Sequence, residues 1–291
     1  MTHVDEEIAS QPACWGLAIE LAERSVAALP EPGERVAAIG CGTSWFMAQA
    51  YATLREATGQ GQTDAFAASE FPAGRRYDRV LAITRSGTTT EVLSALAATD
   101  ARTTVLVGDP DSPAVRRADD VVRMPFADEH SVVQTRFATS ALILLRAHLG
   151  EDLGTVAADA GEAVRAPLPL DPERVEQVSF LGRGWTVGLA HEAALKCREA
   201  ATFWAESYPA MEYRHGPIAI AANDRAVWAF GEVPDGLPDE VAKTGATFVH
   251  SGQHDPLADL IVAQRFAVAV SLARGLDPDR PRNLTRSVIL S

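Results

Sequence analysis

The sequence predicts an α/β protein made of two similar three-layer subdomains, each with a parallel β-sheet covered by helices on both faces. Two observations lead to this prediction. A buried-strand pattern that runs into a glycine-bracketed turn and then a long helix occurs twice, 142 residues apart, at Val36–Ser44 and Val178–Thr186. Strand and helix patterns also alternate along both halves, which is the order found in parallel sheets. We therefore expect an N-terminal helical segment over residues 1–30, a first subdomain over residues 31–152 and a second over residues 170–291.

The first half opens with apolar residues at helical spacing over Gln11–Leu29, which predicts an amphipathic helix. Short apolar runs bounded by turn residues predict strands at Val36–Gly40, Thr63–Ala68, Val80–Ile83, Thr104–Gly108 and Val121–Met124. Longer runs with helical periodicity predict helices at Trp45–Ala57, Glu91–Ala98 and Val132–Leu149.

The second half is separated from the first by Glu151–Glu176, which contains Pro167 and Pro169 and is expected to be a linker. The alternation of strand and helix patterns then repeats. Strands are expected at Gln177–Leu181, Ala226–Gly231 and Thr247–Ser251, helices at Thr186–Phe203 and Leu257–Leu276, and a polar tail over Asp277–Ser291.

Composition narrows the class of protein. A hydrophobic share of 47% with 22% charged residues is ordinary for a globular protein, and we expect no membrane span because no apolar run approaches about 20 residues. The acidic start lacks the pattern of a signal peptide, so a cytosolic protein is expected. A net charge of −13 without any basic run argues against nucleic acid as a partner.

The three cysteines, Cys14, Cys41 and Cys197, are scattered and odd in number. They suggest neither a disulfide framework nor a cysteine-based zinc site, and reduced thiols fit a cytosolic protein. His250 and His254 are interpreted as loop histidines. We therefore expect no bound metal.

Both copies of the repeated turn place glycines and hydroxyls where a strand ends and a helix begins, so backbone N–H groups and the helix dipole favour an anion there. A third turn, Thr84–Thr90, carries hydroxyls on five of its seven residues, together with one glycine and one arginine. This loop suits a phosphate monoester better than an extended cofactor. The alternative is a helix start with surplus caps, because Ser and Thr are good N-caps.

Gly40–Trp45 could also be a dinucleotide-binding turn, but Trp45 stands where that motif needs a third glycine. The phosphate-loop lysine pattern is absent too. We therefore expect no nicotinamide, flavin or other cofactor.

Acid–base candidates lie on the expected helix of the second half. Offsets of four and three residues put Glu192, Lys196 and Glu199 on one helical face, where a carboxylate beside a lysine could abstract a proton next to a carbonyl. The alternative, which spacing alone favours, is a solvated face of salt bridges. His215 precedes Gly216 and Pro217 and is either held at the rim of a site or an ordinary loop histidine.

The combination of these motifs resembles the sugar isomerase (SIS) family, and within it the isomerase half of glutamine–fructose-6-phosphate aminotransferase. The resemblance covers nearly the whole chain from about residue 30. The six motifs that carry it, in order, are Gly40–Ser44, Ala68–Phe71, Thr84–Thr89, Glu192–Glu199, His215–Pro217 and Asp279–Ser287.

The resemblance implies two three-layer α/β subdomains, a homodimer with its sites near the subunit interface, and a phosphorylated sugar or amino sugar as ligand. It implies roles for individual residues as well. Glu199 matches the base that moves a proton between C1 and C2, Lys196 and Glu192 match supporting residues, and His215 matches a histidine that helps open the sugar ring and that the partner subunit can donate. The matching sugar-phosphate positions are Thr84, Arg85, Ser86 and Thr89 for the phosphate, with Thr43, Ser44, Val132 and Gln134 near the sugar, the last usually a serine.

Three departures from the family pattern stand out. Arg286 corresponds to the lysine that forms a Schiff base with the ketose, and a guanidinium cannot take that role, although it can grip a phosphate or hydroxyl. Arg85 replaces a glutamine of the phosphate loop and adds a charged donor suited to an anion. No glutaminase domain precedes the expected isomerase part, and Cys14 lacks the context of an N-terminal nucleophile, so we expect no use of glutamine nitrogen.

The expected function is therefore aldose–ketose isomerisation of a sugar phosphate, deamination of an amino-sugar 6-phosphate, or both. Both reactions need the same proton transfer by Glu199. The alternative is a non-catalytic sugar-phosphate sensor, which Arg286 favours. The acidic residues before the first expected strand do not suit a DNA-binding module.

Overall fold

The computed structural model describes residues 2–252 and 254–290 and confirms the predicted α/β fold with parallel sheets. The described residues fall into two compact units. The first unit contains Ser10–Gly154 together with the chain from Thr285 onward, and the second contains the chain up to Ala9 together with Thr155–Leu284. Each end of the chain therefore belongs to the unit formed mainly by the other half of the sequence.

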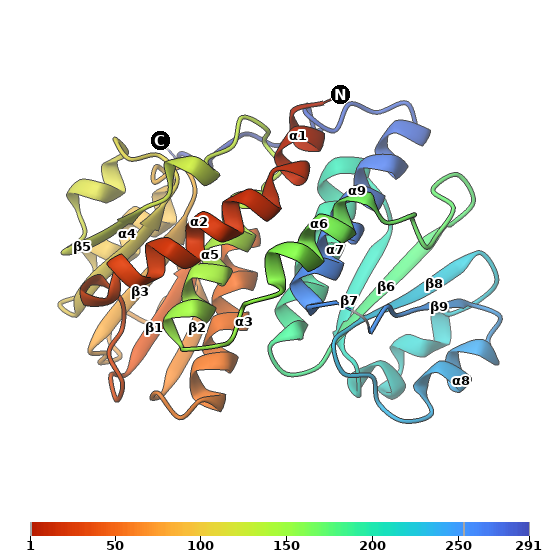
Figure 1. Ribbon diagram of the computed structural model, residues 1–291, viewed down its shortest axis with the longest axis horizontal. Helices are drawn as coiled ribbons and strands as arrows, with labels where there is room; N and C mark the ends of the chain where they lie inside the picture. Colours follow the sequence, from red (N-terminus) through yellow and green to blue (C-terminus); the bar gives the residue numbers. More distant parts are fainter. Residues whose placement is uncertain (1, 253, 291) are drawn as a thin grey trace. The chain divides into compact units, whose positions relative to one another are not determined.

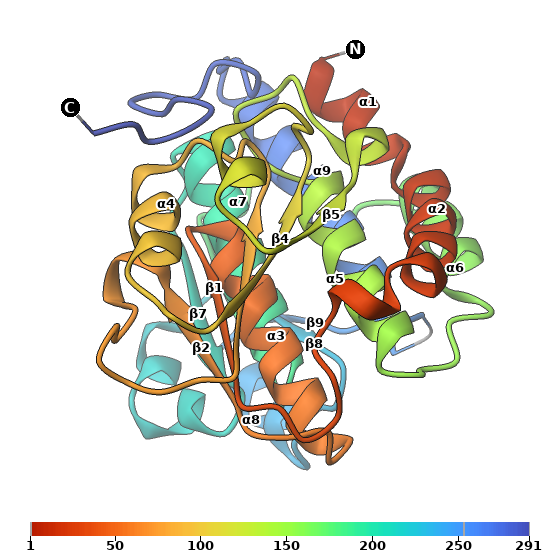
Figure 2. The ribbon, with the colours of Figure 1, turned by 90° about the vertical axis from the view of Figure 1, so that its left-hand side faces the viewer.

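The first unit has a five-stranded parallel sheet in the order β2-β1-β3-β4-β5. All residues of β1 and β3 are buried, as expected of strands covered on both faces. Helix α4 covers one face, where Val92 and Leu96 pack on Ile39 and Val105, and α2, α3 and α5 lie on the other (Figures 1 and 2). The strands are β1 (Val36–Gly40), β2 (Thr63–Ala67), β3 (Arg79–Thr84), β4 (Arg102–Val107) and β5 (Asp120–Arg123), and the helices are α2 (Gln11–Arg24), α3 (Thr43–Ala57), α4 (Thr90–Ala97) and α5 (Arg136–His148).

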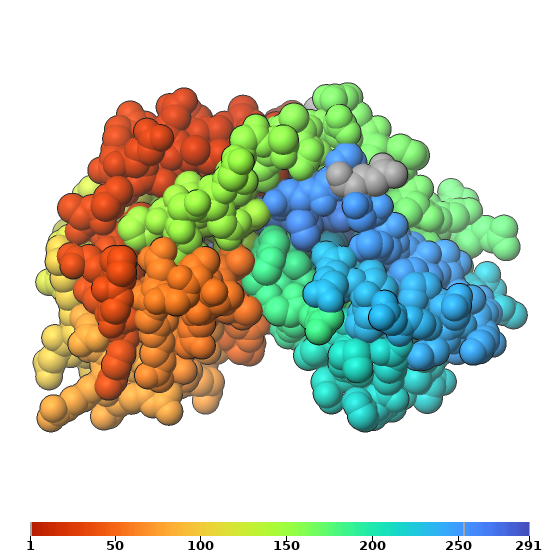
Figure 3. Space-filling view, turned by 60° about the horizontal axis from the view of Figure 1, so that its bottom comes forward, coloured from red at the N-terminus to blue at the C-terminus, as the bar shows by residue number. Residues whose placement is uncertain are grey.

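The second unit has a four-stranded parallel sheet in the order β7-β6-β8-β9, which repeats the first four positions of the other sheet. Helix α6 packs along α9 on one face (Figure 3), together with α7, while α8 and two short 3₁₀ helices cover the other face. The strands are β6 (Gln177–Gly182), β7 (Ala205–Pro209), β8 (Arg225–Phe230) and β9 (Thr247–Val249), and the helices are α1 (His3–Ala9), α6 (Val156–Arg165), α7 (Thr186–Ala201), α8 (Leu237–Ala242) and α9 (Pro256–Ala273).

The duplicated turn is built in the same way in both units. Gly40 and Gly182 end the first strand of their sheets, and a Cβ at either glycine would overlap the first turn of the following helix. Two residues later, Gly42 and Gly184 have φ values of 52° and 57°, which only glycine adopts readily. The repeated sequence pattern is therefore a repeated backbone geometry.

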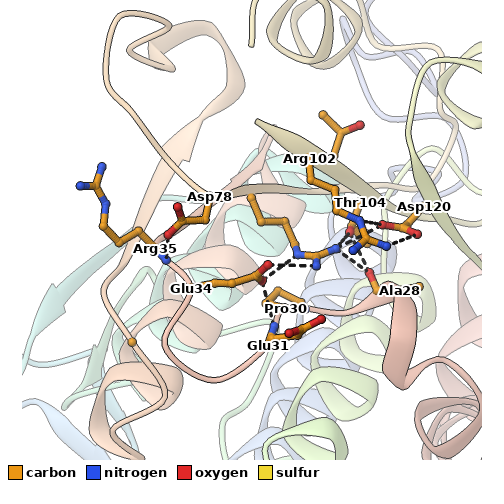
Figure 4. A network of polar contacts seen from close by, with 12 residues as sticks. Ala28, Pro30, Glu31, Glu34, Arg35, Asp78, Arg102, Thr104 and Asp120 are labelled. Carbon is orange, nitrogen blue, oxygen red and sulfur yellow. Dashed lines mark hydrogen bonds and ion pairs between the residues drawn. The ribbon is translucent and has the colours of Figure 1, made fainter. Parts of the chain in front are cut away.

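The N-terminal end of the first sheet is held by the buried guanidinium of Arg79. It pairs with Glu34 at 2.8 Å and Asp120 at 3.2 Å and donates to Thr104, and Figure 4 labels these three partners. Arg102 pairs with Asp120 at 2.7 Å from the surface side. The network ties β3, β4 and β5 to the loop before β1 at the edge opposite the strand ends that lead into α3 and α4.

Several predicted boundaries were wrong. The expected linker Glu151–Glu176 contains helix α6, and β7 and α8 were not predicted as elements. The helix expected to begin at Val132 begins at Arg136, because the carboxylate of Glu129 accepts the N–H groups of Thr135 and Arg136 and so fixes the first turn there.

Helix α9 also corrects the expectation that no apolar run approaches the length of a membrane span. By length and composition its 18 residues, with a mean hydropathy of 1.5, could cross a membrane. Of this window, 72% is buried inside the structure. That burial is typical of the core helix of a globular unit.

Candidate functional site

The strand order of the first unit reverses between β1 and β3, and ligands of open parallel sheets bind at the carboxyl ends of the strands at such a reversal. The turn after β1 leads to Thr43 and Ser44 at the start of α3, and the loop after β3 leads through Ser86 to α4. The topology therefore brings these predicted ligand-binding positions to one edge of one sheet.

The loop between β3 and α4 is shaped by its own short side chains. Gly87 has a φ of 61°, its N–H donates to the hydroxyl of Thr84 at 3.3 Å, and the N–H of Thr88 donates to that of Ser86 at 3.3 Å. Thr89, the residue before α4, makes no capping bond with its side chain. The loop hydroxyls thus order the loop itself, and a surplus of helix caps does not explain them.

Several buried polar atoms at this edge have no hydrogen-bond partner among the described residues. They include Oγ of Ser44, whose side chain follows β1, and Oε1 of Gln134, in the segment before α5. Buried polar atoms are nearly always paired, so an unpaired one suggests a missing ligand or water. Both residues are among the positions predicted to line a sugar.

The guanidinium of Arg85 binds backbone carbonyls of the first unit. Its side chain is 1% exposed, and the guanidinium donates to the carbonyls of Ser131 at 2.8 Å and Arg286 at 2.8 Å and lies 3.8 Å from Glu129. These contacts join the loop before α4, the segment before α5 and the C-terminal segment. Sequence reasoning expected a donor for an anion at this position, and these bonds go to protein carbonyls instead.

The segment before α5 carries Val132 and is anchored at Glu129, a residue the sequence did not single out. Glu129 is buried, and its carboxylate accepts from the N–H of Thr135 at 2.5 Å and the N–H of Arg136 at 2.9 Å. A carboxylate at a helix N-terminus is favourable because of the helix dipole. Glu129 therefore fixes the backbone on which Val132 and Gln134 lie.

Arg286 forms an ion pair with Asp128, in which Nη2 lies 2.6 and 2.9 Å from the two carboxylate oxygens, and its Nη1 donates to the carbonyl of Glu129. The next residues contact the loop before α4: Ser287 Oγ lies 2.9 Å from Thr88 Oγ1, and the carbonyl of Val288 accepts from the N–H of Thr90 at 3.2 Å. No spacing rule could have identified Asp128 or Ser287, because both contacts join residues far apart in sequence.

The predicted acid–base residues lie in the second unit on helix α7. Lys196 Nζ is 3.4 Å from Glu192 Oε1 and 2.5 Å from Glu199 Oε2. The side chains of Glu192 and Lys196 are 1% exposed and that of Glu199 is 21% exposed. The alternative of a solvated salt-bridged face is therefore wrong. The arrangement holds one partly accessible carboxylate against a buried ammonium.

His215 is exposed and ends a short 3₁₀ helix, Glu212–His215, before Gly216 with a φ of 136°. A second histidine that sequence reasoning missed, His191, lies on α7 with Nδ1 2.9 Å from Ser207 Oγ. Burial, and then the charge of Arg198, lower the pKa of His191. The ring is accordingly held in its neutral form at neutral pH.

At the strand reversal of the second unit, the hydroxyl of Thr186 forms hydrogen bonds within the protein. Thr186 Oγ1 accepts from the N–H of Arg183 at 2.9 Å and lies 2.9 Å from the carbonyl of Phe230 at the end of β8. The second copy of the turn thus has the same backbone geometry as the first, but the hydroxyl of Thr186 links the end of β6 to the end of β8. Of the two copies, the one in the first unit better fits the expected anion site.

Within residues 2–252 and 254–290, no group of three or more His, Cys, Asp or Glu side chains is arranged to hold a metal ion.

Comparisons with known proteins agree with these features. Residues 31–149 match the family model of the SIS domain. The chain is 30% identical over 304 residues to the glutamine–fructose-6-phosphate aminotransferase of Methanothermobacter thermautotrophicus, covering 88% of this chain and 51% of that protein. The chain spans about half the length of the curated relatives it matches, 52% and 51% for two of them.

Two solved structures share the fold along nearly the whole chain. A glucosamine-6-phosphate deaminase from Thermotoga maritima is 25% identical with a TM-score of 0.83, covering 99% of this chain and 100% of the other. The C-terminal domain of the glucosamine–fructose-6-phosphate aminotransferase from Francisella tularensis is 19% identical with a TM-score of 0.81, covering 95% and 97%. Residues 31–149 therefore match an SIS domain, and the chain shares the fold of these two structures along nearly its whole length.

Proposed function

We propose that the chain binds a phosphorylated sugar or amino sugar and catalyses proton transfer between C1 and C2, as an aldose–ketose isomerase or an amino-sugar-phosphate deaminase. The observation that carries the proposal is the triad on α7, where Lys196 is buried between Glu192 and Glu199 and only Glu199 keeps substantial access to solvent. A carboxylate that acts as a base must be accessible and held in place, and the ammonium of Lys196, 2.5 Å away, holds the carboxylate of Glu199.

We assign the phosphate group to the loop between β3 and α4, through the hydroxyls of Thr84, Ser86 and Thr89. Support comes from the position of this loop at the strand reversal, where backbone N–H groups and the dipole of α4 favour an anion. Ser44 and Gln134, each with a buried polar atom that lacks a protein partner among the described residues, are the proposed contacts to the sugar. Thr43, Val132 and Arg85 are assigned supporting positions around them.

The proposed reaction balances without a cofactor. Glu199 removes the proton from C2 of an open-chain aldose while the aldehyde oxygen takes up a proton, which gives an enediol. Return of the first proton to C1 and loss of the hydroxyl proton of O2 then give the ketose. With an amino group on C2, the same transfer gives an imine at C2, which water hydrolyses to the ketose and ammonia. His215 is the proposed proton carrier for opening the sugar ring, and Lys196 holds the base and balances its charge.

Of the two reactions, deamination has a specific observation in its favour. The glucosamine-6-phosphate deaminase of Thermotoga maritima matches this chain end to end at 25% identity. A non-catalytic sensor is the second candidate. The observation that favours it is Arg286, whose guanidinium is engaged by Asp128 and cannot form a Schiff base.

Proton exchange tests the proposal directly. The protein is incubated in heavy water with fructose 6-phosphate, glucosamine 6-phosphate and their galacto counterparts, while NMR follows deuterium at C1 and C2 and a coupled assay follows ammonia. Exchange with release of ammonia supports the deaminase, and exchange without ammonia supports the isomerase. Binding without any exchange would reject both enzymes in favour of the sensor.

A further inference from the structure

The two arginines that replace the family's residues in the first unit contact each other. Arg85 Nη2 donates to the carbonyl of Arg286 at 2.8 Å, and both guanidinium groups reach the segment before α5: Arg85 the carbonyl of Ser131, and Arg286 the carboxylate of Asp128. The two substitutions therefore act on one feature, which is the attachment of the C-terminal segment to the first unit.

The attachment is geometrically specific. A guanidinium that donates from two nitrogens to two different groups is fixed in orientation, which a single contact does not achieve. Nη2 of Arg286 contacts both carboxylate oxygens of Asp128, at 2.6 and 2.9 Å, and Nη1 donates to the carbonyl of Glu129. The buried guanidinium of Arg85 holds the backbone of the same residue from the other side. Arg286 is thus fastened by both its side chain and its carbonyl.

The residues that follow Arg286 engage donors at the start of α4. Ser287 Oγ lies 2.9 Å from the hydroxyl of Thr88 and 3.3 Å from that of Thr89, and the carbonyl of Val288 accepts from the N–H of Thr90. These are the groups that a phosphate at the start of a helix would use. The C-terminal segment already satisfies them in the structure.

We propose that Arg286 is a positioning residue that latches the segment 286–288 onto the loop before α4, so that a phosphate monoester binds there in competition with Ser287 and Val288. The inference rests on the proposed function, since it takes this loop as the phosphate site. It adds that the latch weakens phosphate binding and that loosening the latch strengthens it.

The test uses two variants that leave the net charge unchanged. Arg286→Lys keeps the positive charge but has a single nitrogen, which cannot serve both Asp128 and the carbonyl of Glu129 with the geometry of the guanidinium. Ser287→Ala removes the hydroxyl that contacts Thr88 and Thr89. Arg280→Lys is the matched control, because the side chain of Arg280 is 88% exposed and lies 3.9 Å from the carboxylate of Asp277. Inorganic phosphate is the probe, titrated by calorimetry and by ³¹P NMR on the full chain, and thermal melting confirms that each variant is folded.

Both variants are expected to bind phosphate about fivefold more tightly than the unmodified protein, the factor that corresponds to roughly 1 kcal/mol, the size of one partly exposed ion pair or one hydrogen bond. Arg280→Lys should bind as the unmodified protein does. Equal or weaker binding in both variants would overturn the latch and leave the phosphate site in place. If neither the unmodified protein nor any variant bound phosphate or a sugar phosphate, the proposed function would fail together with the latch.

Discussion

The ammonium of Lys196 lies 2.5 Å from the carboxylate of Glu199 on helix α7, and of the two side chains only that of Glu199 has substantial access to solvent, at 21% against 1%. A general base needs both a charge partner and access to the proton it takes. This asymmetry distinguishes Glu199 from Glu192, which contacts the same lysine but is buried.

Glu199→Gln should therefore abolish proton exchange while leaving ligand affinity nearly unchanged. A positioned base contributes roughly 10²–10⁴-fold to the rate, and the amide keeps the shape of the side chain without its basicity. Turnover is measured by deuterium incorporation and affinity by calorimetry. Glu212→Gln, at an exposed glutamate of the second unit, is the control and should exchange normally. Retention of exchange in Glu199→Gln would remove it from the mechanism.

Lys196→Met should destabilise the second unit by about 3–5 kcal/mol, because it leaves the buried carboxylate of Glu192 without its cation. The double variant Lys196→Met with Glu192→Gln removes that uncompensated charge and should recover part of the loss. Urea unfolding of the four proteins of this cycle measures the coupling between the two residues. Additive losses would mean that the buried pair is not energetically coupled.

Arg79→Ala should cost about 3 kcal/mol of stability in the first unit, since the guanidinium has a side-chain exposure of 0% and serves both Glu34 and Asp120. Arg102→Ala is the matched control: it contacts the same Asp120, but its side chain is 47% exposed. The control should shift the urea midpoint much less. Similar shifts of the urea midpoint for both variants would show that buried Arg79 contributes no more to stability than exposed Arg102.

Gly87→Ala should be destabilising by about 2–4 kcal/mol and should impair phosphate binding. Its φ of 61° is unfavourable for alanine, and an added Cβ would overlap the side chain of Ser112. Gly59→Ala is the control, because Gly59 has a φ of 71° but nothing within 4 Å of a new Cβ, so only the backbone penalty of about 1–2 kcal/mol applies. Thermal unfolding should therefore show a larger fall in melting temperature for Gly87→Ala than for Gly59→Ala.

The pH dependence of stability offers a test at Asp259, a buried residue of α9 whose carboxylate accepts from the hydroxyl of Ser251 at 2.6 Å. Burial raises the pKa of Asp259, opposed by the Ser251 hydroxyl and by His254 and His250, while Asp255 acts with burial. A raised pKa in the folded state means that stability falls as the pH rises through that pKa.

Asp259→Asn should therefore be more stable than the unmodified protein at pH 7, with a gap that narrows as the pH falls towards about 4, the ordinary pKa of aspartate. Asp119→Asn should behave in the opposite way. The N–H and hydroxyl of Thr103 lower the pKa of Asp119, so its contribution is present above the ordinary pKa and is lost as the pH falls. Urea midpoints between pH 4 and 8 test both signs.

The sheets could be predicted from the sequence because their central strands are continuous apolar runs between turn residues. Strand β1 was predicted to the residue, at Val36–Gly40. Strand β7, Ala205–Pro209, was missed because its middle residues are polar and only half-buried, which leaves no apolar run to detect. Helix α6 was missed because the prolines that follow it at 167 and 169 suggested a linker along its whole length.

The candidate site could be predicted only in part, and the reason is distance along the chain. Spacing of three and four residues placed Glu192, Lys196 and Glu199 on one face, but not in the interior. No local pattern shows that Arg286 meets Asp128, 158 residues away, or that Arg85 turns towards the carbonyl of Arg286, 201 residues away. The assignments of individual residues to phosphate and sugar remain proposals.

The contribution of the C-terminal segment to the first unit has a consequence for synthesis. Residues Ser10–Gly154 are synthesised before the 130 residues Thr155–Leu284, and only then does Thr285 follow. At about 5–20 residues per second this delay is roughly 6–26 s. During it the nascent first unit presents Thr88 and the N–H of Thr90 without Ser287 and Val288, so a sugar phosphate can occupy the loop before its competitor has been made.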